Sequence, residues 1–228
     1  MKPYVLEYNN HISSDFNVML YSYEVYSGGE NKRQTTAVAG RMGELVSSPT
    51  YKSNLNIEVT FSVFKPFKPK IDQLKQWLGG SGNLSFSDQA ECFYKVITID
   101  WGSIEREIRK YGRFTARFTC IPYKFRKDGQ IEYSSISQNP YAEARPTYKI
   151  IGEGNCTLTV NGNTMTANVG QNITIDTNRM IAYREDGTIQ NTAVTGDYEE
   201  LYLIPGDNVI TITDGFELKT IPNWGYEV

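Results

Sequence analysis

The sequence predicts a mainly β protein of two domains, and three observations lead to this prediction. Apolar and polar residues alternate with a period of two along several segments, which is typical of half-buried strands. The chain contains 16 Tyr and 19 Gly and is 13% aromatic, a composition that favours short strands joined by tight turns. A chain of 228 residues can form one large core or two smaller ones.

The clearest strand signal runs from Leu55 to Val63, where an apolar residue occupies every second position and Asn, Glu, Thr and Ser lie between them. A strand with one face on a core and the other in water fits this period. The same reasoning predicts further strands at 17–25, 94–101, 114–120, 156–160, 173–176, 180–183, 200–204 and 208–213.

One segment, 68–78, has the pattern of a short helix. Its apolar residues Ile71, Leu74, Trp77 and Leu78 form a one-sided stripe, with a proline near its start and two glycines directly after it. We expect this helix to lie on a sheet, with Trp77 and Leu78 as packing anchors inside the chain. A second helical turn over 104–110 is short and strongly charged, which makes it a weak prediction.

A long polar segment between two predicted strands, 27–43, is rich in glycine and cannot bury an apolar face of its own. Loops of this length are either functional arms or disordered segments. The alternatives for this segment are therefore a projecting arm and a flexible surface loop.

The domain boundary is predicted within 134–146, where Asn139-Pro140 and Arg145-Pro146 occur among few large apolar residues. Charge also changes there. Residues 1–143 carry 18 Lys+Arg and 15 Asp+Glu, a net +3, whereas residues 144–228 carry 5 and 11, a net −6. We therefore expect domains at 1–143 and 144–228, with hairpin turns at Asn161-Gly162 and Asp186-Gly187 in the second.

The residues needed for most enzyme and metal sites are scarce. His11 is the only histidine, and Cys92, Cys120 and Cys156 are widely spaced, which excludes the usual zinc-ligand spacing and favours reduced, buried thiols. Glu199-Glu200 would point to opposite faces of a strand, so they do not form a glycosidase pair. We predict no catalytic, metal-binding or cofactor-binding residues, and no enzymatic activity.

The overall charge and hydropathy argue against two kinds of partner, nucleic acids and membranes. A net charge of −3 lacks the concentrated basic face that phosphate binding requires, so we expect no nucleic-acid specificity. No run of about 18 apolar residues is present, and the N-terminus lacks the apolar core of a secretory signal. We expect no membrane insertion, and synthesis and folding in the cytosol.

Several features, taken in order, resemble one protein family over nearly the whole chain. They are Gly40-Arg41-Met42-Gly43, the alternating strand to Phe64, the helix ending Trp77-Leu78, Leu84-Ser85-Phe86-Ser87-Asp88, Tyr94-Lys95-Val96, Gly112-Arg113-Phe114, Phe118-Thr119-Cys120, Pro122-Tyr123, Asn139-Pro140, Gly152-Glu153-Gly154, Ile175-Asp176-Thr177 and Leu203-Ile204-Pro205-Gly206-Asp207-Asn208. In order and spacing, they resemble the distal tail (Dit) proteins of long, non-contractile-tailed bacteriophages.

The resemblance implies an N-terminal, β-sandwich-like domain with one short helix and a projecting hairpin arm, which closes into a hexameric ring. It implies a C-terminal galectin-like β-sandwich as well. The implied partners are other copies of the chain, the major tail tube protein, the tape measure protein, the tail-associated hub protein and, often, a receptor-binding protein. The implied location is the tail tip of the virion, assembled in the cytoplasm of the bacterial host.

A ring needs one surface of a subunit to meet a different surface of the next, and a projecting hairpin can add strands to a neighbouring sheet edge. The candidate residues for this inter-subunit contact are Glu30, Lys32, Arg33, Gln34, Arg41 and Met42. A flexible surface loop is the competing interpretation.

The leading hypothesis is thus a structural adaptor, and the second is a carbohydrate-binding module that contacts the host surface. Trp224 and the abundant tyrosines favour the second hypothesis. Against it, residues 144–228 contain no histidine and a single tryptophan, whereas galectins read galactose with a polar cluster that includes a histidine. A cell-wall hydrolase is the third hypothesis, and the lone histidine makes it weak.

Overall fold

The computed structural model describes the whole chain except residues 1–3, 27–33, 48–51, 65–66 and 107–110. The chain divides into two compact units. Unit 1 comprises Met1–Lys124 with Glu227–Val228, and unit 2 comprises Phe125–Tyr226. The prediction of a mainly β fold is confirmed, since strands form most of the regular structure and the described residues contain a single α-helix.

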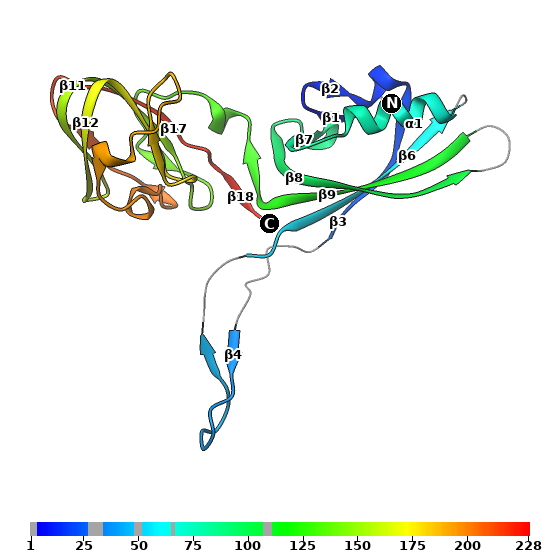
Figure 1. The fold of residues 1–228 in the computed structure, drawn as a ribbon, viewed down its shortest axis with the longest axis horizontal. Helices are drawn as coiled ribbons and strands as arrows, with labels where there is room; N and C mark the ends of the chain where they lie inside the picture. The colour runs from blue at the N-terminus through cyan, green and yellow to red at the C-terminus, as the bar shows by residue number, and fades with distance from the viewer. Residues whose placement is uncertain (1–3, 27–33, 48–51, 65–66, 107–110) are drawn as a thin grey trace. The chain divides into compact units, whose positions relative to one another are not determined.

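Unit 1 is built on an eight-stranded sheet in the order β2-β1-β7-β8-β9-β6-β3, with β18 pairing β9 (Figure 1). The strands are β1 (Leu6–Tyr8), β2 (His11–Ile12), β3 (Val18–Tyr26), β6 (Leu55–Phe64), β7 (Gly82–Phe86), β8 (Cys92–Arg106), β9 (Tyr111–Arg126) and β18 (Gly225–Glu227). A separate two-stranded sheet, β4 (Gln34–Thr36) with β5 (Leu45–Ser47), lies in the chain between β3 and β6.

The core of unit 1 follows directly from the alternation in the sequence. In β6 the five apolar residues from Leu55 to Val63 are at most 1% exposed. The register places Phe61 opposite Phe114 of β9, and these two rings stack with their centroids 5.3 Å apart. Apolar residues on one face of adjacent strands thus meet in one continuous layer.

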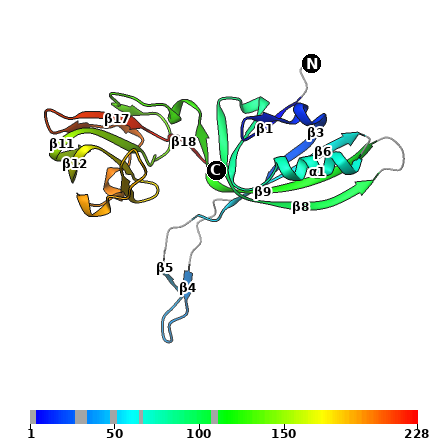
Figure 2. The same cartoon turned by 45° about the horizontal axis from the view of Figure 1, so that its top comes forward.

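Helix α1 (Phe67–Trp77) covers this layer, and Figures 1 and 2 show it lying across the sheet. Ile71, Leu74 and Trp77 are buried together with Leu78, which directly follows the helix. The Trp77 ring stacks on Phe16 with centroids 4.4 Å apart. Its Nε1–H also donates to the Tyr8 carbonyl oxygen at 3.1 Å, which satisfies the buried indole donor.

Unit 2 is organised by one long hairpin, β11 (Thr147–Val160) with β12 (Asn163–Asp176), whose turn is Asn161-Gly162. Both turn residues have positive φ, 52° and 89°, as a two-residue hairpin turn requires. The other strands of this six-stranded sheet are β13 (Ile181–Tyr183), β14 (Val194–Thr195), β16 (Ile210–Ile212) and β17 (Glu217–Ile221). A small separate sheet pairs β10 (Gln138–Asn139) with β15 (Gly206–Asp207).

The long hairpin is bent in its middle. Gly152, Gly154 and Gln171 all have positive φ, at 155°, 102° and 72°, and Gly152 pairs with Gln171 across the two strands. Residues 151–155 of β11 are not buried, whereas alternate residues on either side of them are. The bend lets both halves of the hairpin bury their apolar faces in one core, and the curvature is visible in Figure 1.

Several loops of unit 2 are fixed by buried polar side chains. Asn208, 4% exposed, accepts a hydrogen bond from the Ile204 N–H at 3.0 Å and donates to the Ile204 and Gly206 carbonyl oxygens at 2.8 and 2.9 Å. Asn161 joins this loop to the hairpin turn, since its Nδ2 donates to Asn208 Oδ1 and its Oδ1 accepts from the Val209 N–H, both at 2.9 Å.

A second group of polar side chains fixes the C-terminal segment of unit 2. Arg126 makes a two-pronged ion pair with Asp128 at 2.7–3.1 Å. The Trp224 Nε1–H donates to the same carboxylate at 3.2 Å. Gly129 leaves room for the indole, because a Cβ at this position would lie 2.5 Å from Trp224 Cδ1.

The observed structure differs from the sequence-based prediction at three places. The segment predicted as a strand at 200–204 overlaps the 3-10 helix Glu199–Leu201. The helical turn predicted at 104–110 is strand β8 as far as Arg106, and residues 107–110 lie outside the described residues. The units divide after Lys124, not between 143 and 144. The segment 125–143 groups with unit 2 because Ile136 joins its core and the buried Asn139 donates to the Ala142 and Leu203 carbonyl oxygens.

Candidate assembly surfaces

The sheet β4–β5 is a short hairpin. Only three residue pairs join its strands, from Gln34 with Ser47 to Thr36 with Leu45. Every residue from 35 to 45 is exposed. An isolated two-stranded hairpin is marginally stable at best in water, so this hairpin needs something to pack against. We call the segment 34–47 the arm.

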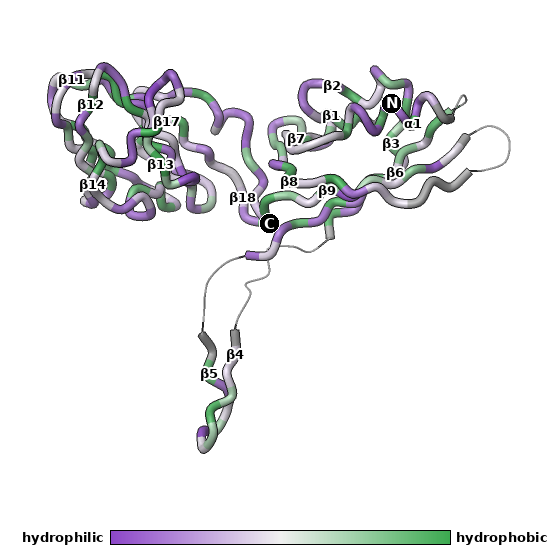
Figure 3. The backbone as a smooth tube through the Cα atoms, in the orientation of Figure 1, coloured by the Kyte–Doolittle hydropathy of each residue, from purple (hydrophilic) through white to green (hydrophobic). Residues whose placement is uncertain are grey.

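The tip of the arm presents apolar side chains on a tight turn. Met42 is fully exposed and Val38 is 46% exposed. Gly40 and Gly43 have left-handed φ values of 84° and 90°, which glycine adopts without strain. Figure 3 shows that hydrophobic and hydrophilic residues are mixed along the described part of the arm.

The sequence-predicted contact residues divide into two groups. Arg41 and Met42 are exposed in the tip, and the backbone of Gln34 belongs to β4. Glu30, Lys32 and Arg33 lie outside the described residues. Trp77 and Leu78 lie in the core of unit 1, at 9% and 0% exposure, and therefore offer no surface to a partner.

The edge strand β3 provides a second candidate surface that the sequence analysis missed. Within the part of the chain that the structure describes, β3 pairs only with β6, so its other edge has unpaired backbone groups. Met19 and Tyr21 on this strand are 53% and 58% exposed. Long apolar edge strands readily pair with another chain, and β3 carries no Lys or Pro to prevent this.

A β-bulge gives β3 its outward tyrosine. The pairing with β6 shifts register between Leu20 and Ser22, so Tyr21 is the extra residue. The Arg113 guanidinium lies over its ring at 4.1 Å from the centroid, a cation–π contact that orders the tyrosine. The signal in the sequence was the run Val18-Met19-Leu20-Tyr21, which is apolar on both faces instead of one.

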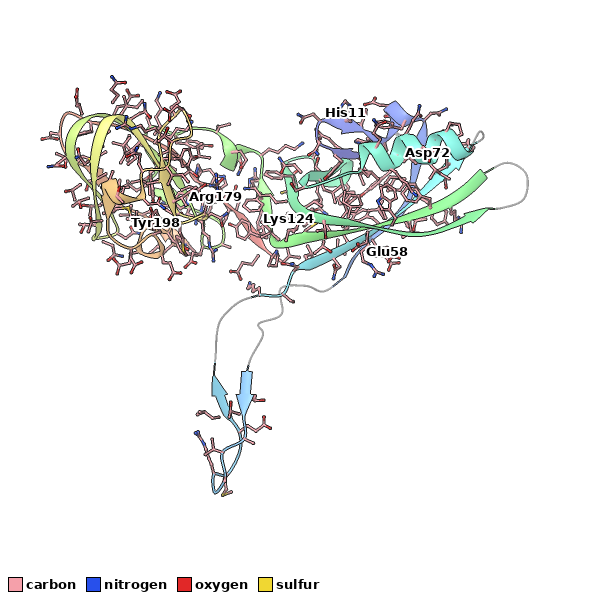
Figure 4. The ribbon with its side chains drawn as sticks, in the orientation of Figure 1. His11, Glu58, Asp72, Lys124, Arg179 and Tyr198 are labelled. Atoms are coloured by element: carbon pink, nitrogen blue, oxygen red, sulfur yellow. The ribbon has the colours of Figure 1, made fainter. Side chains whose placement is uncertain are left out.

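The outward face of β6 and β9 carries polar side chains, several of which pair across the two strands. Arg117 forms an ion pair with Glu58 at 2.8 Å, Thr119 donates to Asn56 at 3.1 Å, and Glu58 is labelled in Figure 4. Exposed pairs of this kind contribute little to stability. Several polar groups of this face therefore pair within the sheet, unlike the backbone groups at the edge of β3.

The groups capable of chemistry are dispersed. His11 is exposed on β2 (Figure 4), with its ring edge toward Phe16 at 6.3 Å. The three cysteines are free and buried. Burial raises the pKa of the Cys120 thiol to about 12 and also raises the pKa of Cys156, so both thiols are neutral at pH 7.

No group of three or more His, Cys, Asp or Glu side chains in the described ranges converges to hold a metal ion. No helix in this part of the chain combines the length and hydrophobicity needed to cross a bilayer.

Comparison with known proteins gives one informative result. No protein-family model matches the chain, and no curated protein matches it. Among solved structures, the fold is similar to that of the SPP1 Dit (gp 19.1) protein, described as a paradigm of the hub adsorption apparatus in phages that infect Gram-positive bacteria. The TM-score is 0.71 at 15% sequence identity, over 96% of this chain and 98% of that one. The chain therefore has a Dit-like fold along nearly its entire length.

Proposed function

We propose that this chain is a structural adaptor at the tip of a long, non-contractile phage tail. The observation that carries the proposal is the end-to-end similarity of its fold to a phage hub adsorption protein. Both units of the chain fall within the match, so a shared small motif does not account for it. The proposed location is the tail tip of the virion.

In this proposal, copies of the chain form a hexameric ring that connects the tail tube to the host-adhesion hub. A ring requires two different surfaces on each subunit. The arm, whose residues 35–45 are all exposed, is suited to be one of them. The unpaired edge of β3 is suited to be the other, because it presents backbone hydrogen-bonding groups beside Met19 and Tyr21.

The proposed partners beyond the ring are the tube protein, the tape measure protein, the tail-associated hub protein and a receptor-binding protein. Unit 1 carries the arm and the β3 edge, so we assign it the ring contacts. Unit 2 carries neither, and we assign it the contacts with host-recognition proteins.

The arm can be tested by its effect on self-association. The Met42→Glu variant places a charge on the fully exposed tip, and it should weaken assembly without changing the stability of unit 1. The matched control is Met180→Glu, because Met180 is an exposed methionine in unit 2. Native mass spectrometry and light scattering over a concentration series measure the stoichiometry.

The β3 edge is tested in the same assay by Met19→Lys, since an edge lysine obstructs strand addition. A sixfold species that both Met42→Glu and Met19→Lys weaken, and that Met180→Glu leaves intact, supports the proposal. A wild-type chain that stays monomeric at every concentration, or a ring that neither substitution affects, contradicts it.

Saccharide binding is a second candidate function, and one observation favours it. Unit 2 has a surface depression of about 400 Å³ with a polar lining. Binding there would give the adaptor a direct contact with the host surface, in addition to contacts made through its partners.

A further inference from the structure

Unit 2 contains a polar depression at the bend of its long hairpin. The depression has a volume of about 400 Å³ and lies between the middle of β12 and the loop that follows β13. Its lining residues are Gly170, Gln171, Asn172, Arg184, Glu185 and Asp186. Such a volume is within the usual range of small-molecule sites.

The backbone at this place has one strained residue and one glycine that makes room for a side chain. Gln171 has a φ of 72°, which non-glycine residues adopt rarely and at a cost of about 1–3 kcal/mol. Gly170 beside it leaves space for an arginine, because a Cβ there would lie 2.6 Å from Arg184 Nη2. The Gln171 backbone is thus strained beside the Arg184 guanidinium, and such backbone strain concentrates at binding sites.

The loop that carries Arg184 is fixed by four hydrogen bonds. The Arg184 N–H donates to the Thr188 carbonyl oxygen at 2.9 Å, and the Gly187 N–H donates to the Arg184 carbonyl oxygen at 2.8 Å. Asp186 accepts from the Thr188 N–H at 2.9 Å. Asn172 Oδ1 accepts from the Glu185 N–H at 2.8 Å, which ties the loop to β12.

The groups that remain are unsatisfied by the protein. In the described part of the chain, no hydrogen bond or ion pair involves the Arg184 guanidinium, the Gln171 amide, the Asn172 Nδ2 or the Glu185 carboxylate. Asp186 has a pKa below its ordinary value because Thr188 donates to it and because Arg184 lies nearby. The depression therefore presents several donors and acceptors on a fixed frame.

The charges of the lining indicate the class of ligand. One cation and two carboxylates do not favour an anion, and amide, guanidinium and carboxylate groups together match a ligand that both donates and accepts hydrogen bonds. The described residues hold no metal-binding cluster.

We propose that this depression binds a neutral saccharide, with Arg184, Asn172 and Glu185 hydrogen-bonded to its hydroxyl groups. The proposal rests on the second candidate function and is independent of ring formation. The depression has no aromatic ring for a sugar to stack on, so we expect weak binding to a single sugar, with a Kd on the order of 1 mM.

The test is titration of the ¹⁵N-labelled full-length chain with D-galactose, N-acetyl-D-glucosamine and L-rhamnose, followed by NMR. We expect saturable shifts at 170–172 and 184–186 with at least one sugar. Arg184→Ala should weaken that binding about tenfold or more, as expected for the loss of hydrogen bonds to a charged group. The matched control is Arg179→Ala, because Arg179 (labelled in Figure 4) lies outside the lining, 5.9 Å from the Tyr183 ring.

A second variant, Glu185→Gln, keeps the backbone N–H that holds Asn172 and serves if Arg184→Ala disturbs the fold. Loss of binding in the lining variants with retention in Arg179→Ala supports the site. No saturable shift with any of the three sugars overturns the proposal, as does binding that neither lining variant weakens. Tighter binding of glycerol 3-phosphate than of the sugars overturns the ligand class. None of these results bears on self-association, so failure here and failure of the adaptor function are distinguishable.

Discussion

The two units of this chain are stabilised in different ways. Unit 1 packs large apolar and aromatic side chains between a curled sheet and a helix, and its inward residues on β6 and β9 are almost completely buried. Unit 2 has an apolar core as well, but its loops are closed by side chains that bind distant backbone groups, as Asn208 and Asn139 do. Apolar residues that pack in a core recur periodically in a sequence, whereas polar side chains that bind distant backbone groups follow no periodic pattern.

The largest expected effect is in the core of unit 1. Phe118 is 0% exposed, and Phe118→Ala should cost about 3–5 kcal/mol of unfolding free energy through lost burial and a cavity. Hydrogen exchange should show lost protection in β6 and β9, with β11 and β12 unchanged. Equal loss of protection in both units would show that they unfold as one.

Removing one of the polar side chains that fix the loops of unit 2 should have a smaller effect on the free energy of unfolding. Asn208→Ala removes hydrogen bonds to Ile204, Gly206 and Asn161 and leaves buried groups without partners, at a cost of about 1–3 kcal/mol. Chemical denaturation of the full-length chain measures this loss of unfolding free energy in unit 2. The control is Asn168→Ala on the exposed face of β12, where we expect a change within about 0.5 kcal/mol. Equal effects would contradict the role of Asn208 in fixing the loops.

The contact between Gly129 and Trp224 should show a similar cost in unfolding free energy, but for a different reason. A methyl group at Gly129 would lie 2.5 Å from Trp224 Cδ1 and 2.9 Å from its backbone nitrogen. Gly129→Ala should therefore cost about 1–3 kcal/mol by overpacking. In a Trp224→Ala background this cost should fall, giving a non-additive double-mutant cycle. Strict additivity would mean that the two positions do not interact.

The smallest expected effect is electrostatic. Arg126 holds the pKa of Asp128 below its ordinary value of 3.8, so the pair contributes stability above about pH 3.8 and loses it as the pH falls through the lowered pKa. The Asp128 side chain is 41% exposed, which limits the contribution to less than about 1 kcal/mol. Asp128→Asn should destabilise unit 2 at pH 7 and match the wild type in strong acid. A difference that persists in strong acid would argue against this ion pair.

The same contrast explains which parts of the fold could be predicted. The strand at 55–63 and the helix at 68–78 were predictable because their apolar residues recur with the period of the structure that buries them. The prediction of a strand at 200–204 was wrong. Leu201 and Leu203 are both buried, but Leu201 lies in the 3-10 helix and Leu203 in an isolated bridge with Ala144, so burial of alternate residues does not require a strand.

The domain boundary predicted near residue 140 shows a different limit of sequence-based prediction. Asn139-Pro140 has the composition of a linker, yet Asn139 is 0% exposed and hydrogen-bonded to a loop 64 residues away in sequence. A contact of that separation cannot be inferred from local composition. For the segment 27–43 the sequence left a projecting arm and a flexible loop as alternatives, and the pairing of β4 with β5 was not predictable from it. The β3 edge and the polar depression were not predictable either, since both depend on which strands are neighbours and where a hairpin bends.

The hairpin turn at Asn161-Gly162 has a consequence for chemical ageing. Asparagine before glycine is the dipeptide most prone to deamidation, because the glycine nitrogen attacks the side-chain carbonyl carbon and expels ammonia. Here both ends of the carboxamide are held by Asn208 and the Val209 N–H, and the attack requires that group to rotate free. This peptide bond should therefore accumulate isoaspartate more slowly than an Asn-Gly bond in an unfolded peptide.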